Sequence, residues 1–204
     1  MAERTGDIDI ERISSSMGFD ELPEVLEAAA TPIRRGHHLA LLAAEGSGKA
    51  SVVALAALET CDPEAEGVQA LVLVPDARPA WRTAADIQRA VGPAGLRVAC
   101  PAAAPAEDRP ADSVQVGADA PILVGRPSRL LPDIRAGLRS IAELRLLVID
   151  GVADLRALDE WGSVEPILET LPEGCRKIAV SSRLEPAFTE LVERQLPRAR
   201  RWPE

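Results

Sequence analysis

The chain has 204 residues, of which 47% are hydrophobic and 27% are charged, so it can bury a core as one large domain or two small ones. Its net charge of −9 disfavours strong non-specific binding to nucleic acid, and its 2% of aromatic residues leaves few rings for base stacking. No apolar run approaches the roughly 20 residues of a membrane span, and the acidic N-terminus does not resemble a secretory signal, so we expect a soluble, cytoplasmic protein without a membrane partner.

Short apolar runs alternate with helix-length segments along the chain. The expected strands cover residues 39–43, 70–74, 96–100, 122–124, 146–150 and 177–180. The expected helices cover residues 20–29, 49–60, 79–91, 127–137, 155–170 and 184–195. This alternation predicts an α/β fold in which a parallel sheet lies between two layers of helices, with ligands binding at the carboxyl ends of the strands.

Two segments follow neither pattern. Residues 101–120 contain Pro101, Pro105 and Pro110, and prolines this close together prevent a continuous helix, so we expect a loop there. Residues 197–204 are rich in arginine and proline, and we expect them to form a C-terminal tail.

A glycine-rich segment follows the first expected strand and directly precedes an apolar helix. Its residues are Ala43, Ala44, Glu45, Gly46, Ser47, Gly48, Lys49 and Ala50. Small residues let such a backbone wrap around phosphate groups, with its amides pointing inward and the helix N-terminus adding positive potential. Lys49 follows the second glycine at the offset that reaches the outer phosphates. The context favours a phosphate-binding loop over the alternative, a Gly-Ser-Gly turn beside an exposed lysine.

The position after Lys49 lacks a magnesium ligand. A phosphate-binding loop normally has serine or threonine there, whose hydroxyl binds Mg²⁺, whereas this chain has Ala50. Ser51 points about 100° away around the helix and therefore cannot substitute. Because Mg²⁺ needs near-octahedral oxygen ligands, we expect water to fill the position at a cost in affinity.

An aspartate ends the expected strand at residues 146–150. Asp150 occupies the place of the carboxylate that associates with magnesium in nucleotide hydrolases, and the alternative is an aspartate that caps the next helix. The upstream glycine loop favours the metal-associated interpretation. The following residue is Gly151, where a hydrolytic enzyme would place a glutamate to orient water. Loss of such a group typically lowers the rate by about 10²–10⁴-fold.

From about Phe19 to about Leu196, the order of these segments resembles the N-terminal RecA-like domain of DEAD-box RNA helicases. Five segments carry the resemblance: 43–50 to the phosphate-binding motif, 71–78 to the Pro-Thr-Arg motif, 124–131 to the Thr-Pro-Gly-Arg motif, 148–154 to the Asp-Glu-Ala-Asp motif and 181–183 to the Ser-Ala-Thr motif. The resemblance implies a RecA-like P-loop NTPase fold over residues 19–196, between an N-terminal extension at 1–18 and the tail at 197–204.

The resemblance also implies ATP and Mg²⁺ as cofactors, weakened here by Ala50 and Gly151. It assigns Lys49 and Asp150 to catalysis, with Asp150 also holding the metal, and it assigns residues 44–50 and Phe19 to nucleotide binding, Phe19 as the aromatic that recognises adenine. The glutamine that accompanies this aromatic in the family has no counterpart in residues 30–36. The family's second RecA-like domain and its arginine have no counterpart here either, so we expect no autonomous unwinding.

Three arginines match positions at which family members hold RNA. Arg78, Arg126 and Arg129 would lie at the carboxyl-end face and contact phosphates, and the alternative is that they are surface arginines with acidic partners. The net charge of −9 disfavours RNA binding.

Two functions remain open at this stage. The first is a nucleotide-binding, helicase-like domain whose hydrolysis is impaired and which could still associate with RNA. The second is a pseudo-helicase that binds a protein partner and no nucleotide. The departures at Ala50, Gly151 and Arg183 favour the second, whereas Lys49 and Asp150 favour the first. Any enzymatic activity would be that of an ATPase or helicase-type hydrolase.

Overall fold

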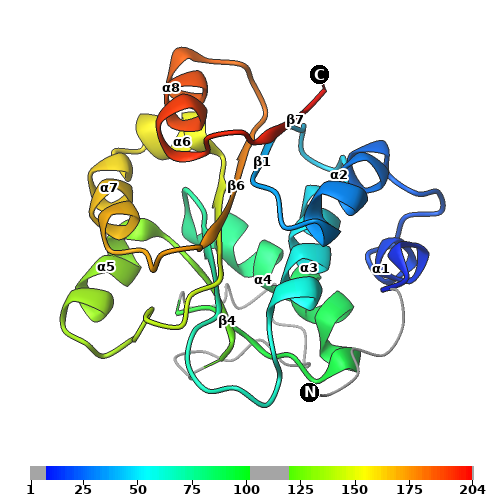
Figure 1. Cartoon of the computed structure of the whole chain (residues 1–204), viewed down its shortest axis with the longest axis horizontal. Helices are drawn as coiled ribbons and strands as arrows, with labels where there is room; N and C mark the ends of the chain where they lie inside the picture. The colour runs from blue at the N-terminus through cyan, green and yellow to red at the C-terminus, as the bar shows by residue number, and fades with distance from the viewer. Residues whose placement is uncertain (1–7, 102–119, 204) are drawn as a thin grey trace.

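The computed structural model of the protein describes residues 8–101 and 120–203, and within them the chain forms one parallel sheet flanked by helices (Figure 1). All six strand pairings are parallel and give the order β3-β4-β2-β5-β6-β1-β7. The strands are β1 (Leu39–Leu42), β2 (Ala70–Leu73), β3 (Val98–Ala99), β4 (Ile122–Gly125), β5 (Leu146–Asp150), β6 (Arg176–Ser181) and β7 (Arg200–Trp202). The sequence-based prediction of a parallel α/β fold is therefore confirmed.

Alternate residues of each central strand enter two separate cores. In β2, Val72 packs in one core and Leu71 and Leu73 pack in the other, and all three side chains are fully buried. The first core lies under α1 (Ile10–Ser16), α2 (Glu24–Arg34), α3 (Lys49–Thr60) and α4 (Ala77–Val91). The second lies under α5 (Pro127–Arg135), α6 (Val152–Ala157), α7 (Trp161–Glu169) and α8 (Pro186–Gln195). Burial on both faces explains why the central strands are continuously apolar.

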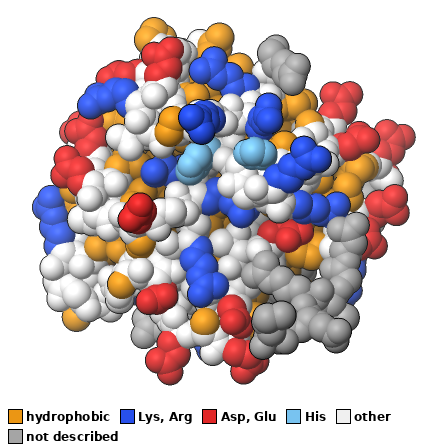
Figure 2. All heavy atoms as spheres, viewed as in Figure 1, with side chains coloured by type: hydrophobic (Ala, Val, Ile, Leu, Met, Phe, Trp, Pro, Cys, Tyr) orange, Lys and Arg blue, Asp and Glu red, His pale blue; other side chains and the backbone are white. Residues whose placement is uncertain are grey.

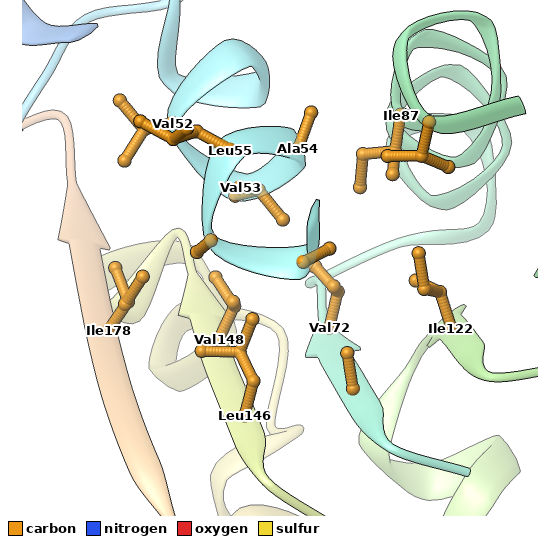
Figure 3. Close-up of a cluster of buried hydrophobic side chains, with 14 of the residues drawn as sticks. Val52, Val53, Ala54, Leu55, Val72, Ile87, Ile122, Leu146, Val148 and Ile178 are labelled. Atoms are coloured by element: carbon orange, nitrogen blue, oxygen red, sulfur yellow. The ribbon is translucent and has the colours of Figure 1, made fainter. Parts of the chain in front are cut away.

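Helix α3, which begins at Lys49, is the most deeply buried helix segment near the glycine loop. From Val52 to Ala57 every side chain is at most 3% exposed, and a helix that is apolar all round must be covered all round. Val53 and its neighbours lie over the sheet beside Val72, Val148 and Ile178, while Ile87 of α4 lies over Ile122 (Figure 3). This packing fixes the start of the helix against the sheet.

Three parts of the structure differ from the sequence-based expectations. The expected helix at 155–170 is two helices, α6 and α7, separated by a turn in which Asp159 has a left-handed backbone with φ 57°. Residues 200–202, expected in the C-terminal tail, form β7 and pair with β1. Helix α1, within the expected N-terminal extension, buries Ile13 in the first core. The boundaries at residues 18 and 196 stay a prediction.

The expected loop at 101–120 lies almost entirely outside the described residues. Within the described parts of the chain, no helix combines the length and the apolar character that crossing a bilayer would require.

Candidate functional site

The glycine loop lies between β1 and α3, at the carboxyl edge of the sheet. Gly48 has a φ of 95°, in the left-handed region that glycine adopts without strain. A Cβ atom at this position would also lie 2.6 Å from the Cβ of Pro23, so no larger residue fits without moving the start of α2. The turn delivers Lys49 as the first residue of α3, at the helix N-terminus, where backbone N–H groups attract anions.

Lys49 and Asp150 meet across this edge. The Lys49 Nζ lies 3.1 Å from Asp150 Oδ1, although β6 separates β1 from β5 in the sheet. Burial raises the pKa of Asp150, and the ammonium of Lys49 opposes that rise through its charge and its hydrogen bond. The structure therefore brings together the two residues to which the resemblance assigns catalysis.

A cavity of about 310 Å³ opens beside this pair. Pockets of 300–1,000 Å³ are of the size that holds small-molecule ligands and cofactors. The lining residues are Met17, Phe19, Glu45, Gly46, Gly48, Lys49, Ala50, Arg78, Pro79, Arg82, Thr83, Asp86 and Asp150. Phe19 thus reaches the glycine loop from the segment that follows α1, at the place which the resemblance implies for an aromatic beside the base.

The ligands available for a metal ion are few. Ala50 lines the cavity and has no oxygen to offer, while the fully buried Ser51 directs its Oγ to the Sδ of Met17 at 3.0 Å. The expectation that Ser51 cannot replace the missing hydroxyl is confirmed. Across residues 8–101 and 120–203, no three His, Cys, Asp or Glu side chains are grouped so that they could hold a metal ion. Asp150 is the carboxylate of this cavity that lies against Lys49, and its assignment to Mg²⁺ stays a prediction.

Glu45 places a carboxylate inside the loop that would hold phosphates. Its side chain lines the cavity, and its negative charge contributes to the raised pKa of Asp150. Sequence analysis counted Glu45 only through its backbone amide. The sequence itself contains this information, because a carboxylate next to the glycines of a phosphate-binding loop repels a phosphate group. Glu45 therefore adds a negative charge to the cavity that Lys49 also lines.

Gly151 has a backbone that disfavours any other residue. Its φ of 78° and ψ of 50° lie in the left-handed region, where it precedes α6. A Cβ atom there would also lie 3.4 Å from the Cγ of Pro75. A glutamate at this position would cost roughly 1–2 kcal/mol in backbone strain alone. Gly151 therefore lacks the carboxylate that would orient water, and a glutamate at this position would strain the backbone.

The three arginines predicted to contact RNA follow β2 and β4 and differ in their partners. Arg78 is exposed and lines the nucleotide cavity. Arg126 donates two hydrogen bonds to Glu160 Oε1, at 2.9 and 2.6 Å. Arg129 lies 3.6 Å from Asp133, which is four residues further along α5. The alternative of surface arginines with acidic partners thus describes Arg126 and Arg129.

Glu160 holds the beginning of α5. Its Oε2 accepts a hydrogen bond from the Ser128 backbone N–H at 2.8 Å, and its Oε1 accepts another from the Ser128 hydroxyl at 2.8 Å. Burial by itself raises the pKa of Glu160, but these bonds and the Arg126 guanidinium outweigh it, so the pKa is lowered. Sequence analysis placed Glu160 inside a continuous helix and missed this role, because its partners are about 30 residues away in the chain.

Replacing Glu160 with glutamine is expected to lower the free energy of unfolding at neutral pH by about 1–3 kcal/mol, because the Arg126 guanidinium and the Ser128 N–H and hydroxyl lose a charged acceptor. The lowered pKa means that the carboxylate stabilises the fold above its ordinary value of 4.5 and that this contribution is lost as the pH falls through the folded pKa. The measurement is urea unfolding between pH 7 and pH 3.

The matched control is Glu193→Gln, since Glu193 is exposed and has no hydrogen bond or ion pair with another described residue. The difference between Glu160→Gln and the unchanged chain should shrink at acid pH. A difference that grows on acidification, or a loss no larger than that of the control, would contradict the assigned network.

The comparisons with known proteins indicate one family. The family model for the DEAD/DEAH box helicase matches residues 24–186. The ATP-dependent RNA helicase DeaD of Haemophilus influenzae is 26% identical over 181 residues, covering 88% of this chain and 29% of that protein. The chain thus spans less than a third of the length of that relative.

Solved structures show the same fold. A DEAD box protein from Methanococcus jannaschii has a TM-score of 0.77 at 19% identity, covering 98% of this chain and 54% of that chain. A Dbp5 variant from S. cerevisiae, bound to a Gle1 variant and IP6, has a TM-score of 0.79 at 19% identity, covering 96% and 49% respectively. With the family model matched over most of its length, and with its glycine loop facing Asp150 on a RecA-like sheet, the chain belongs to the DEAD/DEAH box helicase family.

Proposed function

We propose that the chain binds ATP in the cavity beside the glycine loop and hydrolyses it slowly at most. The observation that carries this proposal is the 3.1 Å contact between Lys49 Nζ and Asp150 Oδ1 at the rim of the loop. A lysine at the start of a helix and a carboxylate at the end of a strand in the same sheet are two of the side chains that hold a nucleoside triphosphate and its metal ion. A relative to which the chain is similar is named an ATP-dependent RNA helicase.

In this proposal, different residues bind the phosphates, the metal ion and the base of ATP. The amides of the loop and the N-terminus of α3 would hold the inner phosphates, and the Lys49 ammonium would turn from Asp150 toward the outer ones. Asp150 would hold Mg²⁺ together with water. Phe19 would cover the base, since it lines the same cavity. A bound Mg²⁺ would neutralise phosphate charge, whereas the Glu45 carboxylate would add negative charge beside the phosphates.

Slow hydrolysis follows from two missing groups. Neither Ala50 nor Gly151 carries an oxygen on its side chain, so one metal ligand and the carboxylate that orients water are both lacking. Loss of a positioned general base alone costs about 10²–10⁴ in rate.

The proposal is tested at position 50 with two substitutions of nearly equal shape. Ala50→Thr adds a hydroxyl where Mg²⁺ would bind, whereas Ala50→Val adds the same volume without it. We expect Ala50→Thr to strengthen Mg-dependent ATP affinity by about tenfold, the equivalent of one hydrogen bond to a charged group. Isothermal titration with and without Mg²⁺ measures this effect. Equal affinities for the two variants would contradict a metal-bound phosphate beside residue 50.

Turnover gives the second readout. With saturating ATP and single-stranded RNA, the unchanged chain should hydrolyse fewer than about 0.1 molecules per second, a hundredfold below the ordinary enzyme rate of about 10 per second. Turnover near that ordinary rate would contradict the slow hydrolysis proposed here.

A second candidate function is a protein-binding pseudo-helicase that takes no nucleotide. The carboxylate of Glu45 inside the loop favours it, and so does the pairing of Arg126 with Glu160, which removes a cation from the carboxyl edge. A related Dbp5 has been solved with the protein Gle1 bound. The absence of any change in melting temperature with ATP, ADP or GTP would favour this function over nucleotide binding.

A further inference from the structure

A second charged surface lies at the amino edge of the sheet, opposite the nucleotide cavity. Four adjacent strands, in the order β5-β6-β1-β7, begin there with basic residues or directly after them. We call this the amino-edge surface and define it by Arg35, Arg145, Arg176, Lys177, Arg198 and Arg200. His37 and His38 lie among these residues, and Figure 2 shows lysine and arginine side chains gathered around the two histidines.

The strand register places these residues side by side. Arg176 is paired with Leu146, the residue after Arg145, and Arg200 is paired with Leu39, the residue after His38. The backbone N–H of Lys177 donates a hydrogen bond to His38 Nδ1 at 2.9 Å, which joins β6 to β1 at this edge. Because neighbouring strands lie about 4.8 Å apart, the row from β5 to β7 extends over roughly 15 Å.

Most of this positive charge has no acidic partner. Among the described residues, no carboxylate lies within 4.0 Å of the side-chain nitrogens of Arg35, Arg145, Lys177, Arg198 or Arg200. Glu59 of α3 pairs with Arg34 at 3.5 Å and also acts on Arg176, and the exposed Glu143 and Glu173 precede β5 and β6 at this edge.

The pKa of His38 responds to these positive charges. Burial lowers the pKa of His38, and the positive charges of Lys177 and Arg176 lower it further. A chain whose net charge is −9 thus gathers six lysine and arginine side chains at this edge of the sheet.

We propose that the amino-edge surface binds the phosphate backbone of RNA. Phosphate recognition needs only positioned cations, and arginine suits it because its planar fork matches the phosphate oxygens. The exposed large apolar side chains of the described residues, Leu138, Leu158 and Leu184, come from none of the strands or the helix that form this surface. A protein interface would need such anchors at its centre.

An acidic peptide is the competing occupant. A groove of about 530 Å³ between α2 and β7 includes Arg200 in its lining and could take apolar side chains of such a peptide. The lack of an exposed apolar anchor among the basic residues favours RNA. Since the nucleotide cavity lies at the opposite edge of the sheet, RNA on the amino-edge surface and ATP in the cavity bind without competing.

The test compares two triple variants of the full chain that lose the same charge. Arg145→Gln/Lys177→Gln/Arg200→Gln removes cations from the amino-edge surface, and Arg12→Gln/Arg89→Gln/Arg194→Gln removes exposed cations elsewhere. Affinity for a fluorescein-labelled 20-nucleotide single-stranded RNA is measured by fluorescence anisotropy from 50 to 200 mM KCl. Three phosphate contacts give a slope of log affinity against log salt of about −2.

The amino-edge variant should lose at least tenfold in affinity and most of this slope, and the control variant should stay within twofold of the unchanged chain. Arg145→Lys/Arg200→Lys keeps the charge and should keep the binding. An unchanged melting temperature and an unchanged affinity for ATP show that the amino-edge variant is folded.

Three results would overturn the proposal. The first is no binding of this RNA by the unchanged chain at 50 mM KCl. The second is equal RNA affinity of the two triple variants. A loss of affinity confined to Arg78→Gln/Arg126→Gln/Arg129→Gln would then assign RNA binding to the carboxyl edge. The third is binding of poly-L-glutamate, but not of RNA, that depends on the amino-edge residues, which would assign the surface to an acidic protein.

Discussion

Replacing Lys49 with alanine is expected to abolish the stabilisation of the chain by Mg-ATP. At an ATP concentration of about 100 times the dissociation constant, the unchanged chain should gain roughly 2.7 kcal/mol, or about 5–10 °C in melting temperature for a domain of this size. Lys49 is the cation that meets Asp150 at the cavity, so its loss removes the contact to the outer phosphates. Thermal unfolding with and without Mg-ATP measures the difference.

The matched control for this prediction is Arg194→Ala. Arg194 is an exposed cation on α8 that pairs with Glu190 at 3.2 Å, and neither residue lines the cavity. It should leave the ATP-induced shift unchanged. If Lys49→Ala keeps a shift as large as that of the control, the nucleotide binds at another place on the molecule.

Replacing Leu71 with alanine should produce the largest loss of stability among the changes considered for this chain. Leu71 lies on β2 between β4 and β5, and its side chain is fully buried in the core under α5 to α8. Removing a buried leucine side chain costs about 2–5 kcal/mol, because it loses apolar burial and leaves a cavity. Urea unfolding monitored by circular dichroism measures the change.

Leu138→Ala is the control for the core, since the Leu138 side chain is 72% exposed. Its effect on the free energy of unfolding should lie within about 0.5 kcal/mol. Equal effects of Leu71→Ala and Leu138→Ala would contradict a central position of β2 in the sheet.

The central sheet could be predicted from the sequence because burial on both faces leaves its strands as uninterrupted apolar runs. β7 could not be predicted on this basis. Its three residues are Arg200, Arg201 and Trp202, and an edge strand that exposes two arginines has no apolar run. Helix α1 has seven residues, and Ile13 is its one fully buried hydrophobic side chain, so neither its length nor a helical period of apolar residues indicated it in the sequence.

The glycine loop and Asp150 were found in the sequence because each is a local pattern, a few residues long, next to a strand. Contacts between distant residues were not found. The buried carboxylate of Glu160 lies in the turn between α6 and α7, and nothing near it in the chain indicates that Ser128 and Arg126 are its partners. The unfavourable charge of Glu45 was visible in the sequence, but its effect on Asp150 depends on the folded geometry.

The most direct test of nucleotide binding at the glycine loop is hydrogen exchange of the backbone amides with and without saturating Mg-ATP. We expect slower exchange in residues 44–51 and around Asp150, because bound phosphates accept hydrogen bonds from the loop and stabilise the start of α3. The amides of the amino-edge surface should exchange at unchanged rates. Unchanged exchange in residues 44–51, or protection confined to another part of the chain, would contradict the proposed function.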